Sequence, residues 1–251
     1  MLDINDLTPA FDASSGGVDL SLSEDTPLGK TVYTFRAADA DQGVNGRLTY
    51  ALGKGSAGVR TVFSLNSDSG DLVLIGGLDR ETRDRMDFVV TATDGGGQPK
   101  SGSVQVRVQV TDVNDNAPVF PSSALLATVK ENVVVGTKFF RVEATDLDLG
   151  DNGKVTYSLV DEAPEFRLDP ATGELFTAQP LDRETVSEYE VTVVAEDGGG
   201  LATRKRLTVV VEDDNDHAPV VESLTTAVLT FPAWDASLSS GNTQTSPYLF
   251  L

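Results

Sequence analysis

Hydrophobic and polar residues alternate with a period of two in short runs along most of this chain. Valines occupy every second position of segment 104–110, and Leu207, Val209 and Val211 keep the same spacing further along. Such alternation predicts half-buried β-strands, because successive side chains of a strand point to opposite faces of the sheet. Clusters of Gly, Asp, Asn and Pro separate the runs, as is typical of all-β domains with many turns.

Further strands are predicted in the first half of the chain. They lie at residues 31–38, 47–52, 63–65, 71–74 and 87–93, and each has a counterpart in the second half. About seven short strands in about a hundred residues indicate a Greek-key β-sandwich. We therefore predict an all-β chain with tandem seven-stranded, immunoglobulin-like sandwiches.

Acidic motifs recur in the same order in both halves of the chain. The segment DINDLTP at 3–9 returns as DVNDNAP at 112–118 and as DDNDHAP at 213–219. Four further motifs lie between these marks: Glu24 and Glu131; the Asp-x-Asp runs at 39–46 and 146–153; Leu-Asp-Arg-Glu at 78–81 and 181–184; and Asp-Gly at 94–95 and 197–198. Repetition at a fixed period predicts an array of similar units.

The motif spacing sets the expected domain boundaries. We place one repeat at residues 10–117 and a second at 118–218. Residues 1–9 are interpreted as the remnant of a preceding linker, and residues 219–251 as a truncated third repeat or a disordered tail. The first residues lack the basic and apolar regions of a signal peptide, and no stretch has the about 20 apolar residues that span a bilayer.

These motifs resemble the XEX, DXD, DRE, XDXGXP and DXNDN patterns of extracellular cadherin repeats. The match covers residues 2–219, and every motif occurs in order in both copies. The N-terminal Trp of strand-swapping cadherins is not found, and the extended run at 39–46 is more similar to protocadherin, Fat and Dachsous arrays. The resemblance implies cadherin repeats joined by calcium-binding linkers.

The charge of the chain agrees with a cation-binding role. With 39 acidic and 19 basic residues, the formal net charge is −20. A nucleic acid or an anionic membrane surface would require a basic face, so neither is an expected partner. The chain has no cysteine, which excludes thiolate metal sites and disulfides. The acids of the repeated motifs account for almost all of the negative excess.

Calcium takes six to eight oxygen ligands, which the motifs can supply as carboxylates and carbonyls. By the resemblance, about three ions belong to the complete middle linker. Two ions on the first-repeat side would be held by Glu24, Asp79, Glu81, Asp112 and Asp115, with a backbone oxygen of Val113. The third would be held by Asn114, Asn116, Asp146, Asp148, Asn152 and Asp197.

Both ends of the array are expected to carry partial calcium sites. The N-terminal site comprises Asn5, Asp39, Asp41, Asn45 and Asp94, and it lacks the acids of a preceding repeat. The C-terminal site comprises Glu131, Asp182, Glu184, Asp213 and Asp216. No Glu follows Glu222, and the tail contains no Asp-x-Asp.

The acidic motifs also have interpretations other than calcium binding. Asp and Asn also initiate turns without binding metal. An EF-hand is rejected, because the twelfth position of each Asp-x-Asp loop is Tyr50 or Tyr157 instead of Glu. Paired carboxylates also hydrolyse glycosides, but here they recur at repeat boundaries, so we expect no enzyme. Arg80 and Arg183 are interpreted as structural groups, and His217 and Trp234 as residues without a specific role.

The resemblance implies calcium-dependent cell–cell adhesion by an ectodomain on the extracellular side of the plasma membrane. The parent protein is expected to cross the membrane once. The expected partner is another cadherin ectodomain, with homophilic binding favoured over heterophilic binding. The alternative is a non-adhesive calcium-binding spacer or a soluble fragment of a larger cadherin. In both cases, we expect calcium to stiffen the linker, because unneutralised carboxylates would repel one another.

Overall fold

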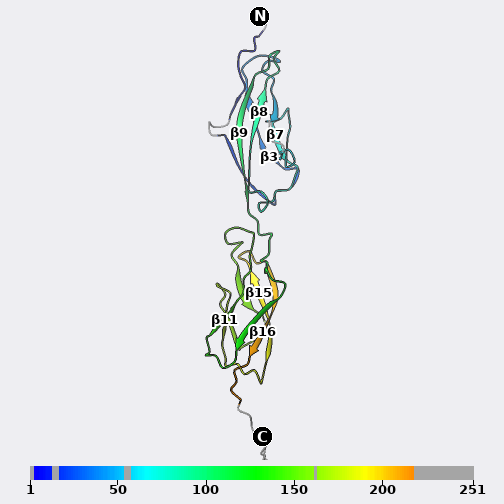
Figure 1. The fold of residues 1–251 in the computed structure, drawn as a ribbon. Helices are drawn as coiled ribbons and strands as arrows, with labels where there is room; N and C mark the ends of the chain where they lie inside the picture. Colours follow the sequence, from blue (N-terminus) through cyan, green and yellow to red (C-terminus); the bar gives the residue numbers. More distant parts are fainter. Residues whose placement is uncertain (1–2, 13–16, 54–57, 161–162, 218–251) are drawn as a thin grey trace, which may run out of the picture. The chain divides into compact units, whose positions relative to one another are not determined.

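The computed structural model describes residues 3–12, 17–53, 58–160 and 163–217, and these residues form two β-sandwiches (Figure 1). The part of the chain that is described contains strands, turns and loops but no helix, and therefore no helix that could span a membrane. The predicted tail at 219–251, including Trp234, lies outside the described residues. The prediction of an all-β chain of tandem sandwiches is confirmed.

The first sandwich consists of a four-stranded and a three-stranded sheet. The larger sheet has the order β2 (Val18–Ser23), β9 (Ser101–Thr111), β8 (Arg85–Thr93) and β5 (Thr49–Leu52). The smaller sheet has the order β3 (Thr31–Thr34), β7 (Asp71–Leu74) and β6 (Phe63–Leu65). A separate pair joins β1 (Ala10–Phe11) to β4 (Ala37–Ala38). Strands β2 and β9 are parallel, and the other pairs are antiparallel.

The second sandwich repeats this topology. Its larger sheet has the order β10 (Leu125–Lys130), β16 (Ala202–Glu212), β15 (Glu188–Glu196) and β12 (Thr156–Leu159). Its smaller sheet has the order β11 (Lys138–Arg141), β14 (Glu174–Thr177) and β13 (Phe166–Leu168). A single bridge between Val119 and Thr145 stands where the first sandwich has the β1–β4 pair.

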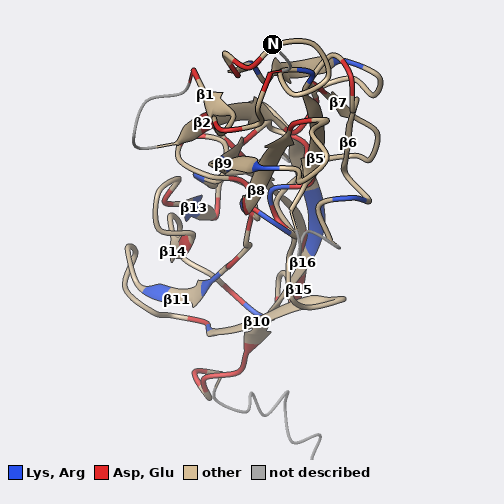
Figure 2. Ribbon diagram, turned by 90° about the horizontal axis from the view of Figure 1, so that it is seen from above, with Lys and Arg blue, Asp and Glu red and all other residues tan. Residues whose placement is uncertain are grey.

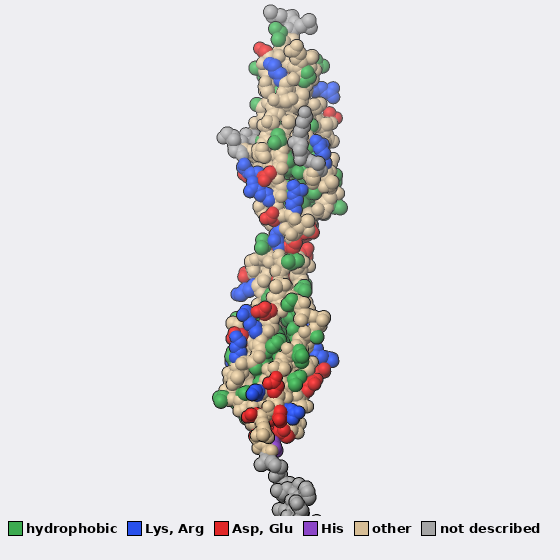
Figure 3. All heavy atoms as spheres, viewed as in Figure 1, with side chains coloured by type: hydrophobic (Ala, Val, Ile, Leu, Met, Phe, Trp, Pro, Cys, Tyr) green, Lys and Arg blue, Asp and Glu red, His purple; other side chains and the backbone are tan. Residues whose placement is uncertain are grey.

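Each sandwich has its own hydrophobic core, built from the alternating positions of its strands. Val106 and Val108 of β9 are fully buried with Leu72 of β7, and Val209 of β16 is fully buried with Leu175 of β14. Most outward positions are polar, and on the face drawn in Figure 3 side chains of both charges are interspersed with apolar ones. The core faces therefore follow the phase that the alternation predicts.

One predicted strand is interrupted. The pattern predicts a continuous strand at 31–38, but strand pairing stops after Thr34 and resumes at Ala37. Phe35 is buried and its N–H donates to the Gly70 carbonyl, while the N–H of Ala37 donates to the Tyr50 hydroxyl at 3.0 Å. The chain therefore leaves β7 and pairs with β1. The strands at 63–65 and 71–74 agree with the predicted bounds.

Candidate metal centre

The predicted ligands of the middle linker lie where strands of both sandwiches end. Glu24 directly follows β2, Asp79 and Glu81 occupy the turn between β7 and β8, and the connector at 112–117 begins at the end of β9. The second repeat contributes the loop at 146–152 and the turn after β15. In the ribbon of Figure 2 the Asp and Glu positions are red, and many of them fall in loops and turns between the strands.

Glu24 forms a clasp between two of these segments. Its Oε2 accepts the Arg80 backbone N–H at 2.8 Å, and its Oε1 accepts the Val113 N–H at 2.7 Å. The second repeat repeats this clasp: Glu131 accepts the N–H groups of Arg183 and Asp214, both at 2.8 Å. Each Glu is buried, so it satisfies backbone donors that would otherwise lack a partner. The two Glu residues were predicted as ligands, but the clasp was not predicted. The sequence signal for the clasp is that Glu24 and Glu131 recur in step with the Asp-Arg-Glu turns.

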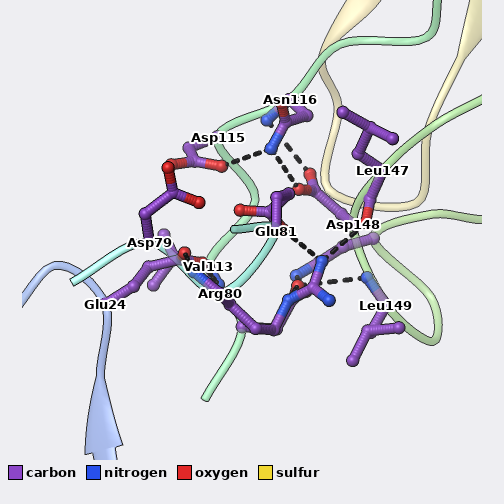
Figure 4. Close-up of polar contacts among 12 residues, drawn as sticks. Glu24, Asp79, Arg80, Glu81, Val113, Asp115, Asn116, Leu147, Asp148 and Leu149 are labelled. Carbon is purple, nitrogen blue, oxygen red and sulfur yellow. Dashed lines mark hydrogen bonds and ion pairs between the residues drawn. The ribbon is translucent and has the colours of Figure 1, made fainter. Parts of the chain in front are cut away.

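Carboxylates from several segments converge around the clasp (Figure 4). Three groups have ligand atoms that all lie within 4.8 Å of one another: Glu24, Glu81 and Asp115; Glu81, Asp112 and Asp148; and Asp146, Asp148 and Asp197. Because Glu81 and Asp148 each belong to two groups, the three groups form one connected set. The set includes side chains from both repeats. Asp79 accepts hydrogen bonds from the backbone and hydroxyl of Thr82 at its own turn.

The pKa values in this set reflect burial and mutual repulsion. Burial raises the pKa of Glu81, and the neighbouring Glu24 and Asp115 raise it further. Burial also raises the pKa of Asp115, with repulsion from Glu24 acting in the same direction. The carboxylates thus lie in an environment that disfavours their negative charge, which is the condition in which a bound cation stabilises the site most.

Asp112 differs from these two acids. Burial alone would raise its pKa, but hydrogen bonds from the Asn152 amide at 2.9 Å and the Leu149 N–H at 3.1 Å lower it, as does Arg80. The net pKa of Asp112 lies below its ordinary value. The structure therefore holds Asp112 in its charged form.

Free acceptor oxygens show that the second-repeat side of the set fits a hard cation. The Oδ1 atom of Asp197 accepts the N–H groups of Gly199, Gly200 and Leu201 at 2.6–2.9 Å, whereas its buried Oδ2 has no hydrogen-bond donor. Asp146 shows the same division, and the buried Oδ1 of Asn114 also lacks a donor. Buried acceptors are normally satisfied. Three unsatisfied oxygens on neighbouring residues match the oxygen ligands that calcium requires.

Gly199 lets Asn114 reach this position. A Cβ atom at Gly199 would lie 2.0 Å from Nδ2 of Asn114, so the Asn114 side chain would have to move away. Gly96 has the same relation to Asn5 in the first repeat, at 2.1 Å. The Asp-Gly-Gly-Gly sequence that follows β8 and β15 is the signal that could have revealed this contact.

Asn116 and Asn152 act as donors in this arrangement. The Asn116 amide donates to Asp115 at 2.6 Å and to Asp148 at 2.9 Å, and the Asn152 amide donates to Asp112. The two amides thus orient the carboxylates of Asp112, Asp115 and Asp148. The backbone N–H of Val113 is bound to Glu24.

The N-terminal partial site repeats the arrangement around Asp197. The Asn5 amide donates to Asp94 Oδ1 at 3.0 Å, and the buried oxygens Asn5 Oδ1 and Asp39 Oδ2 have no donor. Asp41 accepts the Leu7 N–H at 3.1 Å, and burial raises its pKa. Asn45 donates to Asp3 at 3.0 Å.

The structure brings part of the predicted C-terminal site together. Glu131, Asp182 and Glu184 have ligand atoms within 4.8 Å of one another. Asp213 lies 3.4 Å from the Arg183 guanidinium. The Asp216 carboxylate lies 2.6 Å from Nδ1 of His217.

The fold and this acidic junction define a tandem array of Greek-key sandwiches with carboxylate-rich connectors. The family model for the cadherin domain matches residues 19–111 and 126–212, so the chain belongs to the cadherin family. The predicted likeness to protocadherin and Dachsous repeats is confirmed by relatives of both kinds. Proteins of this adhesion family are not enzymes, and the glycosidase alternative is therefore rejected.

The regions that match individual relatives span most of this chain but only a small part of each relative. Human Protocadherin gamma-B7 is 39% identical over 240 residues, which are 90% of this chain and 25% of that protein. The Drosophila melanogaster Protein dachsous is 36% identical over 86% of this chain and 6% of its own length. The chain thus spans a quarter or less of these relatives.

Solved cadherin structures share the fold. The structure titled "Protocadherin gammaB7 EC3-6 cis-dimer structure" has a TM-score of 0.80 and 33% identity, covering 89% of this chain and 55% of that one. Mouse Cadherin-23 EC22-24 has a TM-score of 0.76 and 31% identity, covering 84% of this chain and 68% of that one. The sandwiches described above are therefore extracellular cadherin repeats.

Proposed function

We propose that this chain is a calcium-binding segment of a cell-adhesion ectodomain, and that calcium at the middle linker fixes one repeat against the next. The observation that carries the proposal is the set of buried oxygens without donors on Asn114, Asp146 and Asp197, beside a group of three carboxylates within 4.8 Å. Turn formation alone would leave no reason for these buried oxygens to lack hydrogen-bond donors. Membership of the cadherin family supports the same assignment.

The middle linker would hold about three calcium ions, the number that the resemblance to cadherin repeats implies. Glu24, Asp79, Glu81, Asp112 and Asp115 would serve two ions, with the Val113 carbonyl as a backbone ligand. Asn114, Asp146, Asp148 and Asp197 would serve the third, with Asn116 and Asn152 orienting the carboxylates that they contact. The end sites would bind fewer or weaker ions. We also retain the boundaries 10–117 and 118–218 as the proposed repeats.

Calcium supplies positive charge that offsets the repulsion among the carboxylates of the middle linker. Two carboxylates 4 Å apart repel each other by about 4 kcal/mol at an effective dielectric constant of about 20. Glu81, Asp112 and Asp148 come from two repeats and from the connector, so their repulsion acts to separate the repeats. Neutralising this set removes the repulsion and joins the repeats through shared ligands. The linker would consequently stiffen in calcium.

The adhesive role would be played by the parent protein, anchored in the plasma membrane with this segment outside the cell. We propose another cadherin ectodomain as the partner, with homophilic binding favoured. One related protocadherin structure is described by its title as a cis-dimer, which supports contacts between cadherin chains. Extracellular calcium modules bind with Kd of about 10⁻⁴–10⁻³ M, so these sites would fill outside the cell and stay empty in the cytosol.

A calcium titration of the melting temperature tests the metal site. Ligand binding at ten times Kd stabilises the folded state by about 1.4 kcal/mol per site, so the native protein should melt several degrees higher in calcium at a few millimolar than in chelator. Asp146→Asn should remove part of this gain. Asp68→Asn, which changes an exposed acid in the β6–β7 turn, is the matched control and should keep it. An equal gain in the two variants, or no gain in the native protein, contradicts the proposed site.

Bead aggregation tests the adhesive part separately. Beads coated with the chain should cluster in calcium and disperse in chelator if this segment carries an adhesive face. Beads that stay dispersed, while the melting temperature still responds to calcium, would identify the segment as a calcium-binding spacer. The two assays together therefore separate metal binding from adhesion.

A further inference from the structure

The Arg80 side chain crosses the junction between the repeats. It is only 8% exposed, and its guanidinium is paired with Glu81 beside it and with Asp112, whose Oδ1 lies 2.5 Å from Nε. The Nε–H does not point along this contact, so the contact is an ion pair and not an aligned hydrogen bond. Nη2, the nitrogen that contacts Glu81, also donates to the Leu147 carbonyl of the second repeat at 2.6 Å (Figure 4).

Arg183 occupies the same motif position in the second repeat but has different surroundings. Its backbone N–H is clasped by Glu131 just as that of Arg80 is clasped by Glu24, at 2.8 Å in both repeats. Its side chain, however, is 43% exposed, and Nη1 lies 3.9 Å from Glu184 and 3.4 Å from Asp213. The burial and close pairing of Arg80 are therefore not dictated by the Asp-Arg-Glu turn alone. They accompany its contact with the loop at 146–150.

We propose that Arg80 is a positioning residue that links the two repeats without metal and lowers the calcium affinity of the middle linker. A planar guanidinium can contact two carboxylates and a carbonyl at once, and here it contacts Glu81, Asp112 and Leu147. The link holds the loop at 146–150 against the connector. Asp112 then accepts the Leu149 N–H at 3.1 Å, which continues the same network.

The effect on calcium follows from charge. Glu81 and Asp112 are proposed calcium ligands, and a permanent cation paired with both of them reduces their attraction for a second cation. This half of the inference rests on the proposed function, whereas the link itself does not. Arg80 thus orders the junction in the absence of calcium and raises the calcium concentration needed to fill it.

Two variants of Arg80 separate the two effects. Arg80→Gln removes the charge and the link, whereas Arg80→Lys keeps the charge but cannot bridge both carboxylates and the carbonyl. Arg183→Gln is the matched control, because it makes the same change at the exposed counterpart. The rate of hydrogen exchange at the Leu149 amide in chelator measures the link between the repeats. The calcium midpoint, which is the calcium concentration that gives half of the increase in melting temperature, measures the calcium affinity.

Both Arg80→Gln and Arg80→Lys lose the charged hydrogen bond from Arg80 to the Leu147 carbonyl, which holds the loop that carries Leu149. Hydrogen exchange at the Leu149 amide should therefore become about tenfold faster or more in both variants. The calcium midpoint of Arg80→Gln should fall by at least about threefold, while that of Arg80→Lys stays near the native value. Arg183→Gln should change neither readout. A general loss of stability would instead speed exchange throughout the first repeat and raise the midpoint.

Unchanged exchange at Leu149 in both Arg80 variants overturns the link. A midpoint for Arg80→Gln that is equal to or above the native value overturns the effect on affinity. If the native protein itself shows no calcium response, the proposed function fails, and the exchange measurement in chelator still decides whether Arg80 links the repeats.

Discussion

The clasp formed by Glu24 predicts a large and specific loss when this residue becomes Gln. The carboxylate is 8% exposed and accepts one backbone N–H on each oxygen, at 2.8 Å from Arg80 and at 2.7 Å from Val113. A Gln side chain has a single acceptor oxygen, so in either orientation its NH₂ group faces one of the two N–H donors. One hydrogen bond is lost, one buried donor is left unsatisfied, and the remaining bond loses its charge assistance.

These losses have known sizes. An unsatisfied buried donor costs about 1–3 kcal/mol, and replacing a charged hydrogen bond by a neutral one costs about 1 kcal/mol more. We therefore expect Glu24→Gln to lower the free energy of unfolding of the first repeat by about 2–4 kcal/mol in chelator. For a domain of this size, that corresponds to a melting temperature lower by about 10 °C or more.

Glu131→Gln is the matched control for this variant. Glu131 has the same two backbone contacts and is 2% exposed, so in chelator it should destabilise the second repeat by a similar amount. Hydrogen exchange resolved along the chain assigns each loss to its own repeat. In calcium, only Glu24→Gln should weaken the response of the middle linker. The reasoning is refuted if Glu24→Gln costs less than about 0.5 kcal/mol in chelator, the size of an ordinary surface substitution.

Two further predictions concern the second repeat away from the linker. Asp169 accepts the N–H groups of Thr172 and Ala171, and these hydrogen bonds lower the pKa of Asp169 below its ordinary value of 3.8. The charged form of Asp169 therefore stabilises the folded repeat above pH 3.8. This contribution is lost as the pH falls through the lowered pKa. Asp169→Asn should keep the turn, since Asn66 makes the same contacts in the first repeat. In chelator, the stability of this variant should fall less below about pH 4 than the stability of the native protein does. An equal fall in the two proteins contradicts this prediction. Leu175→Ala should lower the free energy of unfolding of the second repeat by about 2.7–5 kcal/mol, measured by denaturant melts, because the side chain is fully buried; a loss below about 1 kcal/mol would contradict its placement in the core.

The strands could be predicted because their signal is local. Alternation in segments 63–65 and 71–74 is bounded by a turn with Asn66 and Gly70, and the structure has the same bounds. The interruption after Thr34 had no local signal, since apolar residues continue through Phe35. It arises from contacts with Gly70 and Tyr50, which are distant in sequence. Alternation therefore gives the face of each residue but not the point at which a strand changes its partner.

The candidate site was predictable in its residue types but not in its contacts. Acids that recur in order in two repeats identify the groups that can meet, because a repeated fold brings equivalent positions to equivalent ends of each sandwich. One oxygen of Asp197 accepts three backbone N–H groups and the other accepts none, because the glycine-rich turn points its N–H groups at one side of the carboxylate. The contact between Asn114 and Gly199 depends on the shape of the same turn.

Arg80 and Arg183 show the limit of motif reasoning most clearly. Both lie between Asp and Glu in identical tetrapeptides, and both donate a backbone N–H to a buried Glu. Among residues 3–217 as the structure describes them, Arg80 has a loop of the following repeat against its side chain and Arg183 does not, and this neighbour makes Arg80 a buried cation with a contact across the junction. Identical motifs can thus have different electrostatic roles, because the role depends on the segment that follows them in the array. Calcium affinity should therefore differ between linkers whose ligand sequences are the same.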